Sequence, residues 1–124
     1  MLYLIVFVGA GIGGALRHGV NIGAARLLGY NFPFGTLIVN VIGSFAMGLL
    51  AGYFAFRGSA SQHWQLFFTT GILGGYTTFS AFSLDTALLY ERSELGVAAL
   101  YILGSVALSI GGLFAGLALA RHYF

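Results

Sequence analysis

The segment from Gly74 to Ser83 reads GGYTTFSAFS and is the least helical part of the sequence. It lies inside a long apolar segment, yet its paired glycines are followed by β-branched and hydroxyl residues, which are weak helix formers. We therefore expect the helix to break here. In a bilayer a broken helix is tolerated only where it is buried or lines a cavity, because its freed carbonyls need partners. These carbonyls either hold a small cation or accept hydrogen bonds from nearby threonine hydroxyls, and the sequence leaves both readings open.

The composition around this stretch predicts an all-α membrane protein. Of the 124 residues, 59% are hydrophobic and 6% are charged, whereas soluble domains carry about 25% charged residues. A transmembrane helix needs about 20 largely apolar residues, and runs of that length occur four times. We predict a single transmembrane domain, 1–124, with four helices near 2–28, 34–56, 63–90 and 95–120. The expected connections are 31–33, 57–61 and 91–94.

Several classes of function are excluded by what the sequence lacks. It has no cysteine, so disulfides and thiolate chemistry are impossible, and its net charge of +2 is too small for nucleic-acid binding. It has no catalytic triad with a glycine elbow, no paired carboxylates and no phosphate-binding loop, so we do not expect an enzyme. The loops are too short to form a soluble module, and no soluble protein partner is implied.

The arginines predict how the chain inserts. With four spans both termini lie on one face, where Arg57 and Arg121 fall, while Arg26 and Arg92 fall on the opposite face. Membrane proteins orient by an excess of basic residues on one side, and here the two sides are equal. We therefore expect dual topology. Oppositely oriented copies can pair about a twofold axis in the membrane plane, which predicts an antiparallel homodimer.

Polar side chains form two stripes within the predicted spans. Thr36, Asn40 and Ser44 recur every four residues along 34–56, and Tyr101, Ser105 and Ser109 do the same along 95–120, so each set shares one helix face. Serine and threonine can satisfy themselves by bonding a carbonyl one turn back, but asparagine cannot do so fully. We therefore favour a functional role for Asn40.

Two charged residues lie deeper in the spans. Arg17 either extends its long side chain to the membrane surface or attracts anions near a pore mouth. Asp85 is the embedded acid, toward the far end of 63–90.

The motif of residues 74–83, taken with Gly35-Thr36-Leu37-Ile38-Val39-Asn40 and Gly13-Gly14-Ala15-Leu16-Arg17, resembles the Fluc (CrcB) family of fluoride channels across essentially the whole chain. The resemblance implies an antiparallel dual-topology homodimer with two fluoride pores in the inner membrane of a bacterium or archaeon. It further implies passive export of fluoride, which protects the cell from fluoride that enters as HF.

The resemblance also assigns roles to residues. It implies that the fluoride pathway is formed by Asn40, Phe79, Ser80, Phe82, Tyr101, Ser105 and Ser109. The backbone carbonyls of Gly74 and Thr77 would hold a structural Na⁺ at the dimer centre, contributed by both copies. Arg17, Thr36 and Asp85 would serve a vestibule or support the pore. Tyr76 stands where the family often has a smaller aliphatic residue, and Asp85 where glutamate is common.

Two alternatives remain. A small dual-topology multidrug or cation exporter would also have four helices, but it needs an embedded acid that titrates, and Asp85 lies off-centre. A structural membrane subunit would not need the polar stripes or the broken helix.

Overall fold

The computed structural model describes residues 1–57 and 62–123, and every regular element in these two ranges is a helix. The predicted connection 57–61 lies outside the described residues except for Arg57, the last residue of α2. The elements in chain order are α1 (Leu2–Leu28), α2 (Phe34–Arg57), α3 (Gln62–Leu66), the π-helix η1 (Phe67–Leu73), α4 (Gly74–Tyr76), α5 (Phe79–Glu91) and α6 (Leu95–Tyr123).

Among the described residues, three uninterrupted helices are long and apolar enough to cross a membrane: Leu2–Leu28, Phe34–Ala55 and Leu95–Tyr123. This confirms the predicted class, an all-α protein with membrane-spanning helices. The predicted span 63–90 is occupied differently, by the short elements α3, η1, α4 and α5 in succession. Because its helix is divided, each of these four elements is too short to cross a membrane alone.

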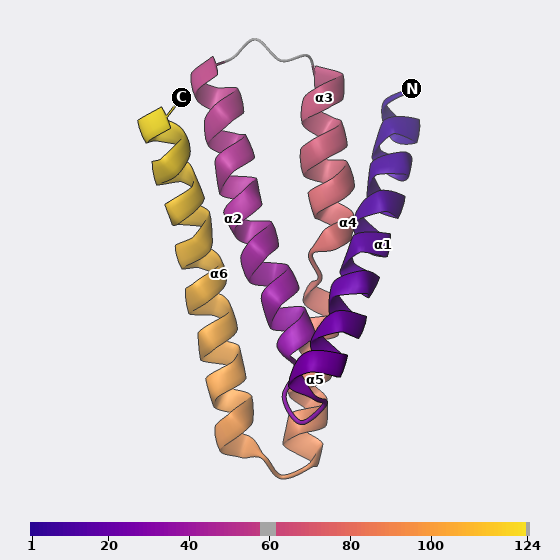
Figure 1. The fold of residues 1–124 in the computed structure, drawn as a ribbon, viewed down its shortest axis with the longest axis vertical. Coiled ribbons are helices and arrows are strands. Elements are labelled where there is room, and N and C mark those ends of the chain that lie inside the picture. The colour runs from indigo at the N-terminus through magenta and orange to yellow at the C-terminus, as the bar shows by residue number, and fades with distance from the viewer. Residues whose placement is uncertain (58–61, 124) are drawn as a thin grey trace.

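The helices form two packed pairs that approach each other at one end of the molecule (Figure 1). Helix α2 lies along α6, and α1 lies along η1 and α4. Both termini lie at the same end (Figure 1). The α5–α6 turn lies at the opposite end (Figure 1).

Glycines permit this close packing. A Cβ atom at Gly9 of α1 would lie 2.9 Å from the Cα of Gly71 in η1, and one at Gly48 of α2 would meet the backbone of Leu113 in α6. Small residues at four-residue spacing let helix backbones touch, which is the main source of packing energy where lipid removes the hydrophobic effect between helices. The pair Gly19 and Gly23 has the same spacing but meets nothing within 4 Å.

The helix break lies at Thr77 and Thr78, inside the stretch where the sequence predicts it. Both residues are extended, with φ −79° and ψ 157° at Thr77 and φ −150° and ψ 123° at Thr78. β-Branched side chains favour this backbone, so the two threonines stabilise the interruption locally. Helix α5 restarts at Phe79, and its first N–H groups therefore lie in the middle of the third segment.

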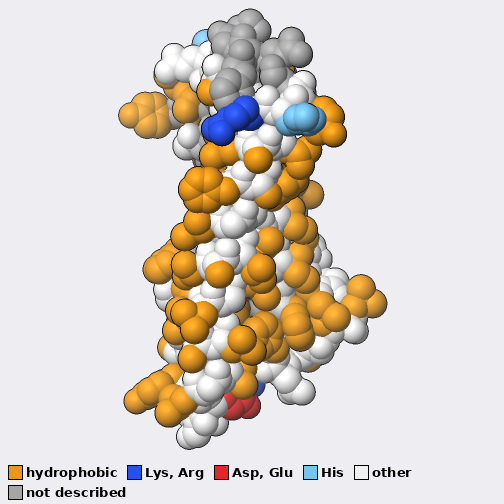
Figure 2. All heavy atoms as spheres, turned by 90° about the vertical axis from the view of Figure 1, so that its left-hand side faces the viewer, with side chains coloured by type: hydrophobic (Ala, Val, Ile, Leu, Met, Phe, Trp, Pro, Cys, Tyr) orange, Lys and Arg blue, Asp and Glu red, His pale blue; other side chains and the backbone are white. Residues whose placement is uncertain are grey.

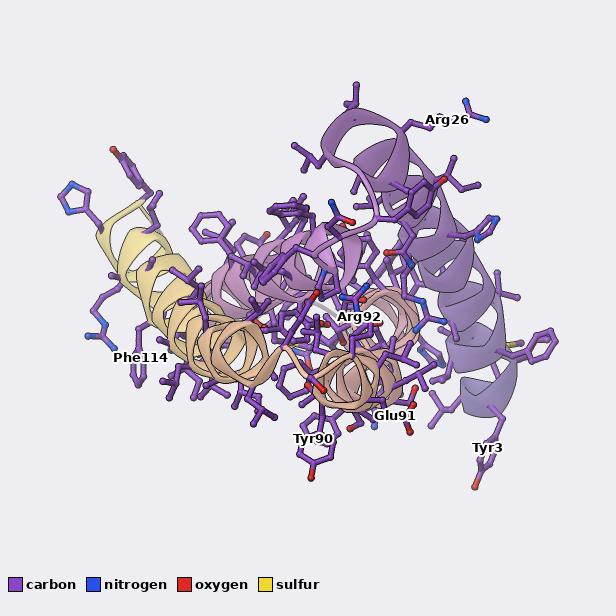
Figure 3. All side chains as sticks on the ribbon, turned by 90° about the horizontal axis from the view of Figure 1, so that it is seen from below. Tyr3, Arg26, Tyr90, Glu91, Arg92 and Phe114 are labelled. Atoms are coloured by element: carbon purple, nitrogen blue, oxygen red, sulfur yellow. The ribbon has the colours of Figure 1, made fainter. Side chains whose placement is uncertain are left out.

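Charged side chains gather at the two ends. In Figure 2 the face that includes α6 is covered along its length by hydrophobic side chains, with basic groups near one end and acidic groups near the other. Figure 3 shows Tyr3, Tyr90 and Phe114 pointing outward, whereas Arg92 turns toward the middle of the bundle end. There the Arg92 Nη2 donates to the carbonyl oxygen of Asn31 at 3.1 Å and to Glu94 Oε2 at 3.2 Å.

Candidate functional site

A groove of about 380 Å³ lies where α2 and α6 meet the helix break, and we call it the break groove. It is lined by side chains from all three, and none of them is charged. The lining residues that bear on the argument are Asn40 and Ser44 of α2, Thr77, Thr78, Phe79 and Phe82 at the break, and Ser105 and Ser109 of α6. The structure therefore brings four of the six residues of the two polar stripes into one cavity.

The Asn40 side chain pairs with both backbone groups of Thr78. Its Nδ2 donates to the Thr78 carbonyl oxygen at 2.9 Å, and its Oδ1 accepts from the Thr78 backbone N–H at 2.8 Å. This double contact fixes the orientation of the amide, because only one placement of its oxygen and nitrogen fits both groups. The amide oxygen is occupied, so the polar group that Asn40 can still offer to the groove is its second N–H.

Thr78 also caps α5. Its Oγ1 accepts from the backbone N–H of Ala81 at 3.1 Å and lies 3.2 Å from Ser80 Oγ. A side-chain oxygen at this N-cap position satisfies one of the free N–H groups of the first turn. The remaining N–H groups of that turn carry the positive end of the helix dipole and lie next to the groove, because Phe79, the first residue of α5, lines it.

Ser105 of α6 contributes an unsatisfied hydroxyl. The residue is 6% exposed, and its Oγ is buried without a hydrogen-bond partner among the described residues. A buried hydroxyl without a partner costs about 1–3 kcal/mol, so native structures contain few of them. Because Ser105 lines the break groove, the partner that this buried hydroxyl lacks would have to come from the groove.

Phenylalanine rings border the groove at the start of α5. The ring centroids of Phe79 and Phe82 lie 5.5 Å apart at an interplanar angle of 55°. Phe79 is 77% exposed, whereas Phe82 is half-buried with its ring 5.2 Å from that of Tyr101. The groove is therefore open beside Phe79, and one protomer does not enclose it.

Tyr101 connects the groove region to a second cavity, which we call the Asp85 pocket. Tyr101 is 1% exposed, and its hydroxyl donates to Asp85 Oδ2 at 3.1 Å. The Asp85 pocket has a volume of about 330 Å³ and is lined by polar groups that include Asn21, Thr36, Asp85 and Arg92. Phe32 packs edge-on against the Tyr101 ring, with centroids 5.5 Å apart, and also lines this pocket.

Comparison with known proteins identifies the family of this chain. Residues 4–117 match the family model described as CrcB-like protein, Camphor Resistance (CrcB). The chain belongs to the CrcB-like family. Relatives in this family include the Fluoride-specific ion channel FluC 2 of Nitrobacter hamburgensis, 68% identical over 98% of both chains. Others are the Fluoride-specific ion channel FluC of Rhodopseudomonas palustris strain BisB5, 65% identical over 98% of both chains, and that of Agrobacterium fabrum, 52% identical over 97% of this chain and 96% of the relative.

The match to the CrcB-like family confirms the resemblance read from the motifs. With its long apolar helices and its ion-channel relatives, the chain is a multi-pass membrane protein. Proteins named as ion channels are not enzymes, in keeping with the absence of catalytic motifs in the sequence.

The structure distributes the predicted site residues of this CrcB-like protein over two places. Asn40, Phe79, Phe82, Ser105 and Ser109 line the break groove, and Thr36 and Asp85 line the Asp85 pocket. Ser80 is exposed beside the groove, and Tyr101 lies buried between the two cavities. Half-buried Arg17 lines neither cavity. The roles of these residues in a pathway stay predictions.

Two features of the site are not predicted by the sequence. The pairing of Asn40 with Thr78 joins residues 38 positions apart, and no local pattern signals it. The Asp85 pocket combines residues of α1, α2, α5 and the turn that follows α5, and two of them, Asn21 and Arg92, had no predicted site role. The signal in the sequence for the first of these was an asparagine within a predicted span, whose amide cannot be fully satisfied on its own helix.

Proposed function

We propose that this protein is a fluoride channel that releases fluoride from the cytoplasm passively and so lowers its toxicity. Two observations support the proposal: the relatives with high identity over nearly the whole chain are named fluoride-specific ion channels, and the break groove offers hydrogen-bond donors without a fixed charge. The second observation carries the chemical argument.

Fluoride is small and strongly hydrated, so a pathway must replace the water that the ion sheds. The groove offers the second N–H of Asn40, whose oxygen is already occupied, and the unpartnered hydroxyl of Ser105. Ser109 adds a hydroxyl one turn further along α6. These neutral donors bind an anion weakly enough to let it leave, whereas a buried cation would trap it.

The phenylalanines complete this environment. An aromatic ring carries partial positive charge at its edge, so a ring edge turned toward an anion attracts it without a formal charge. Phe79 and Phe82 stand at the groove next to the N-terminus of α5, whose dipole favours negative charge. We infer that fluoride passes from the groove past Phe82 and Tyr101 toward the Asp85 pocket. Arg17 lies outside both cavities, and its charge would attract the ion as it approaches.

An antiparallel homodimer is part of the proposal. The exposed ring of Phe79 and the open side of the groove need a covering surface, and a second copy provides one. Two arginines are expected on each face of the membrane, and this equal number favours insertion in both orientations in the inner membrane. The dimer would contain two pathways related by the twofold axis.

We further infer a structural Na⁺ site formed by the Gly74 and Thr77 carbonyls of both copies. Carbonyl oxygen is a hard ligand that suits a small hard cation, and interrupted membrane helices bind Na⁺ in this way. The residues fit, because Thr77 follows α4 in an extended conformation and Gly74 is exposed on the protomer surface. When bound, the ion would supply positive charge that offsets the carbonyl dipoles and joins the copies.

The proposal is tested by reconstituting the purified protein alone into liposomes loaded with fluoride. A potassium ionophore sets the membrane potential, and an electrode follows fluoride release. We expect rapid release that follows the potential, since a unit charge gains about 2.3 kcal/mol per 100 mV. Release no faster than from protein-free liposomes would refute the channel.

The same liposomes distinguish a fluoride channel from the alternative, a small cation exporter. That exporter predicts proton-coupled uptake of organic cations and no fluoride release. The break groove gives it no support, because a proton-coupled exporter needs a titrating acid in its transport site and no acidic side chain lines this groove.

A further inference from the structure

The carbonyls at the end of α4 lose their helical partners to two side chains. In a continuous helix the Gly74 carbonyl would accept from the N–H of Thr78, and the Thr77 carbonyl from the N–H of Ala81. Here the Thr78 N–H donates to Asn40 Oδ1 at 2.8 Å, and the Ala81 N–H donates to Thr78 Oγ1 at 3.1 Å. Both carbonyls are therefore released, and they are the two assigned to sodium.

The nearest substitute donor for Gly74 is also occupied. A tighter helical turn would pair the Gly74 carbonyl with the N–H of Thr77. That N–H donates to the Leu73 carbonyl at 3.0 Å, and Thr77 Oγ1 donates to the same carbonyl at 2.9 Å. The hydroxyl of Thr77 thus satisfies Leu73 rather than Gly74, so the Gly74 carbonyl keeps its capacity for a cation.

We propose that Asn40 is a positioning residue for the sodium site, in addition to its place in the fluoride pathway. This inference rests on the sodium site of the proposed function. Asn40 never touches the cation. Its amide oxygen holds the N–H that would otherwise close on the Gly74 carbonyl, while its amide nitrogen holds the Thr78 carbonyl and keeps the backbone extended.

The Asn40 amide would therefore serve both the sodium site and the fluoride pathway, and substitutions can distinguish the two roles. The sodium site requires an acceptor at the Oδ1 position, and the fluoride pathway requires a donor toward the groove. Aspartate retains the acceptor for the Thr78 N–H, loses the donor to the Thr78 carbonyl and places negative charge beside the groove. Leucine has nearly the same size and offers neither acceptor nor donor. The two substitutions therefore affect the two sites differently.

The experiment measures the midpoint of thermal unfolding of the purified protein in detergent, titrated with NaCl at constant ionic strength against N-methylglucamine chloride. Fluoride release from liposomes is measured on the same preparations. We expect wild-type protein to gain stability with sodium. For Asn40→Leu we expect the sodium concentration of half-maximal stabilisation to rise by about tenfold or more, the usual effect of removing a residue that positions a metal ligand.

Asn40→Asp should lose fluoride release, and it should weaken the sodium dependence less than Asn40→Leu, because it keeps the acceptor for the Thr78 N–H and loses only the donor to the Thr78 carbonyl. Ser44→Ala is the matched control, because Ser44 lines the same groove one turn along α2 and has no contact with Thr78 among the hydrogen bonds of the described residues. It should leave the sodium dependence unchanged. Unaltered sodium dependence in Asn40→Leu would overturn the proposal, as would its loss in Ser44→Ala.

Threonine variants provide a second route if Asn40→Leu fails to fold. Thr78→Val keeps the β-branched shape but removes the hydroxyl that holds the Ala81 N–H, so this N–H can return to the Thr77 carbonyl and weaken sodium binding. Thr86→Val is the control, because it removes a hydroxyl that donates to the Phe82 carbonyl within α5 and contributes no group to the sodium site, so it should bind sodium like the wild type. Equal sodium dependence in the two variants would contradict the mechanism.

The outcomes also separate this inference from the proposed function. Wild-type protein that releases fluoride but gains no stability from sodium would reject the sodium site, and with it the role of Asn40, while leaving the channel intact. Sodium-dependent wild-type protein without fluoride release would reject the channel and leave the positioning role standing.

Discussion

Replacing Ser105 with alanine should make the folded protein more stable and the pathway slower. The Ser105 hydroxyl is buried without a partner, and such a group costs about 1–3 kcal/mol. Alanine removes that cost and leaves a void of only one oxygen atom in a groove that is already about 380 Å³. We therefore expect the free energy of unfolding to rise by about 1 kcal/mol in buffer without fluoride.

The effect on fluoride has the opposite sign. A hydrogen bond to a charged group contributes about 1.5–3 kcal/mol, and each 1.4 kcal/mol added to a barrier slows passage tenfold. If half of the bond is lost where the ion crosses its barrier, fluoride release falls by roughly three- to twelvefold. Wild-type protein should also be stabilised by saturating fluoride, and Ser105→Ala should lose most of that gain.

Thermal unfolding with and without fluoride, together with release from liposomes, measures both effects. Ser109→Ala is the control, because Ser109 lines the same groove but has no buried unsatisfied hydroxyl. It should slow release without any gain in stability. A Ser105→Ala variant that is less stable than wild type and conducts normally would show that the hydroxyl serves the fold, and the reasoning would fail.

Three further predictions follow from the packing and the charges. Phe82→Ile should reduce fluoride release by about tenfold in folded protein, because an aliphatic side chain has no positive edge; release at the wild-type rate would remove Phe82 from the pathway. Gly13→Ala should destabilise the protein by about 1–3 kcal/mol in thermal unfolding, since its Cβ would meet the backbone of Ile72, whereas Gly14→Ala has open space and should be neutral or slightly stabilising. Ser93→Cys gives a single thiol in a chain without cysteine, and an impermeant maleimide applied to intact cells should label about half of it under dual topology; labelling of all or none would refute that topology.

The sequence predicted those parts of the fold that depend on local composition. Long apolar runs specify spanning helices wherever lipid is the solvent, since the backbone must then be paired within each helix. The break was predictable for the same reason: Gly74, Gly75 and the two threonines weaken a helix wherever they stand. The π-helix from Phe67 to Leu73 was not, because it arises where η1 packs against the glycines of α1.

The candidate site was predictable in its residues but not in their contacts. Four-residue spacing placed Ser105 and Ser109 on one face, and both line the groove. Tyr101 shares that face, but its long side chain carries the hydroxyl to Asp85. Spacing along a helix gives the direction of a Cβ atom, whereas the partner of a long side chain depends on which helix stands opposite.

A single interruption of a helix creates both kinds of binding group that the proposed channel needs. Breaking a helix frees carbonyls at the end of the first half and N–H groups at the start of the second, and these attract ions of opposite sign. In water both sets would be hydrated and of no use. In the membrane interior each must find a partner. The Thr78 N–H donates to Asn40, and the Ala81 N–H donates to the Thr78 hydroxyl. In the proposed channel, the Gly74 and Thr77 carbonyls and the other N–H groups of the first turn of α5 are the groups that bind ions. Cation and anion sites on one break are therefore expected to be mechanically linked, because any motion of Thr78 that closed the helix would remove both together.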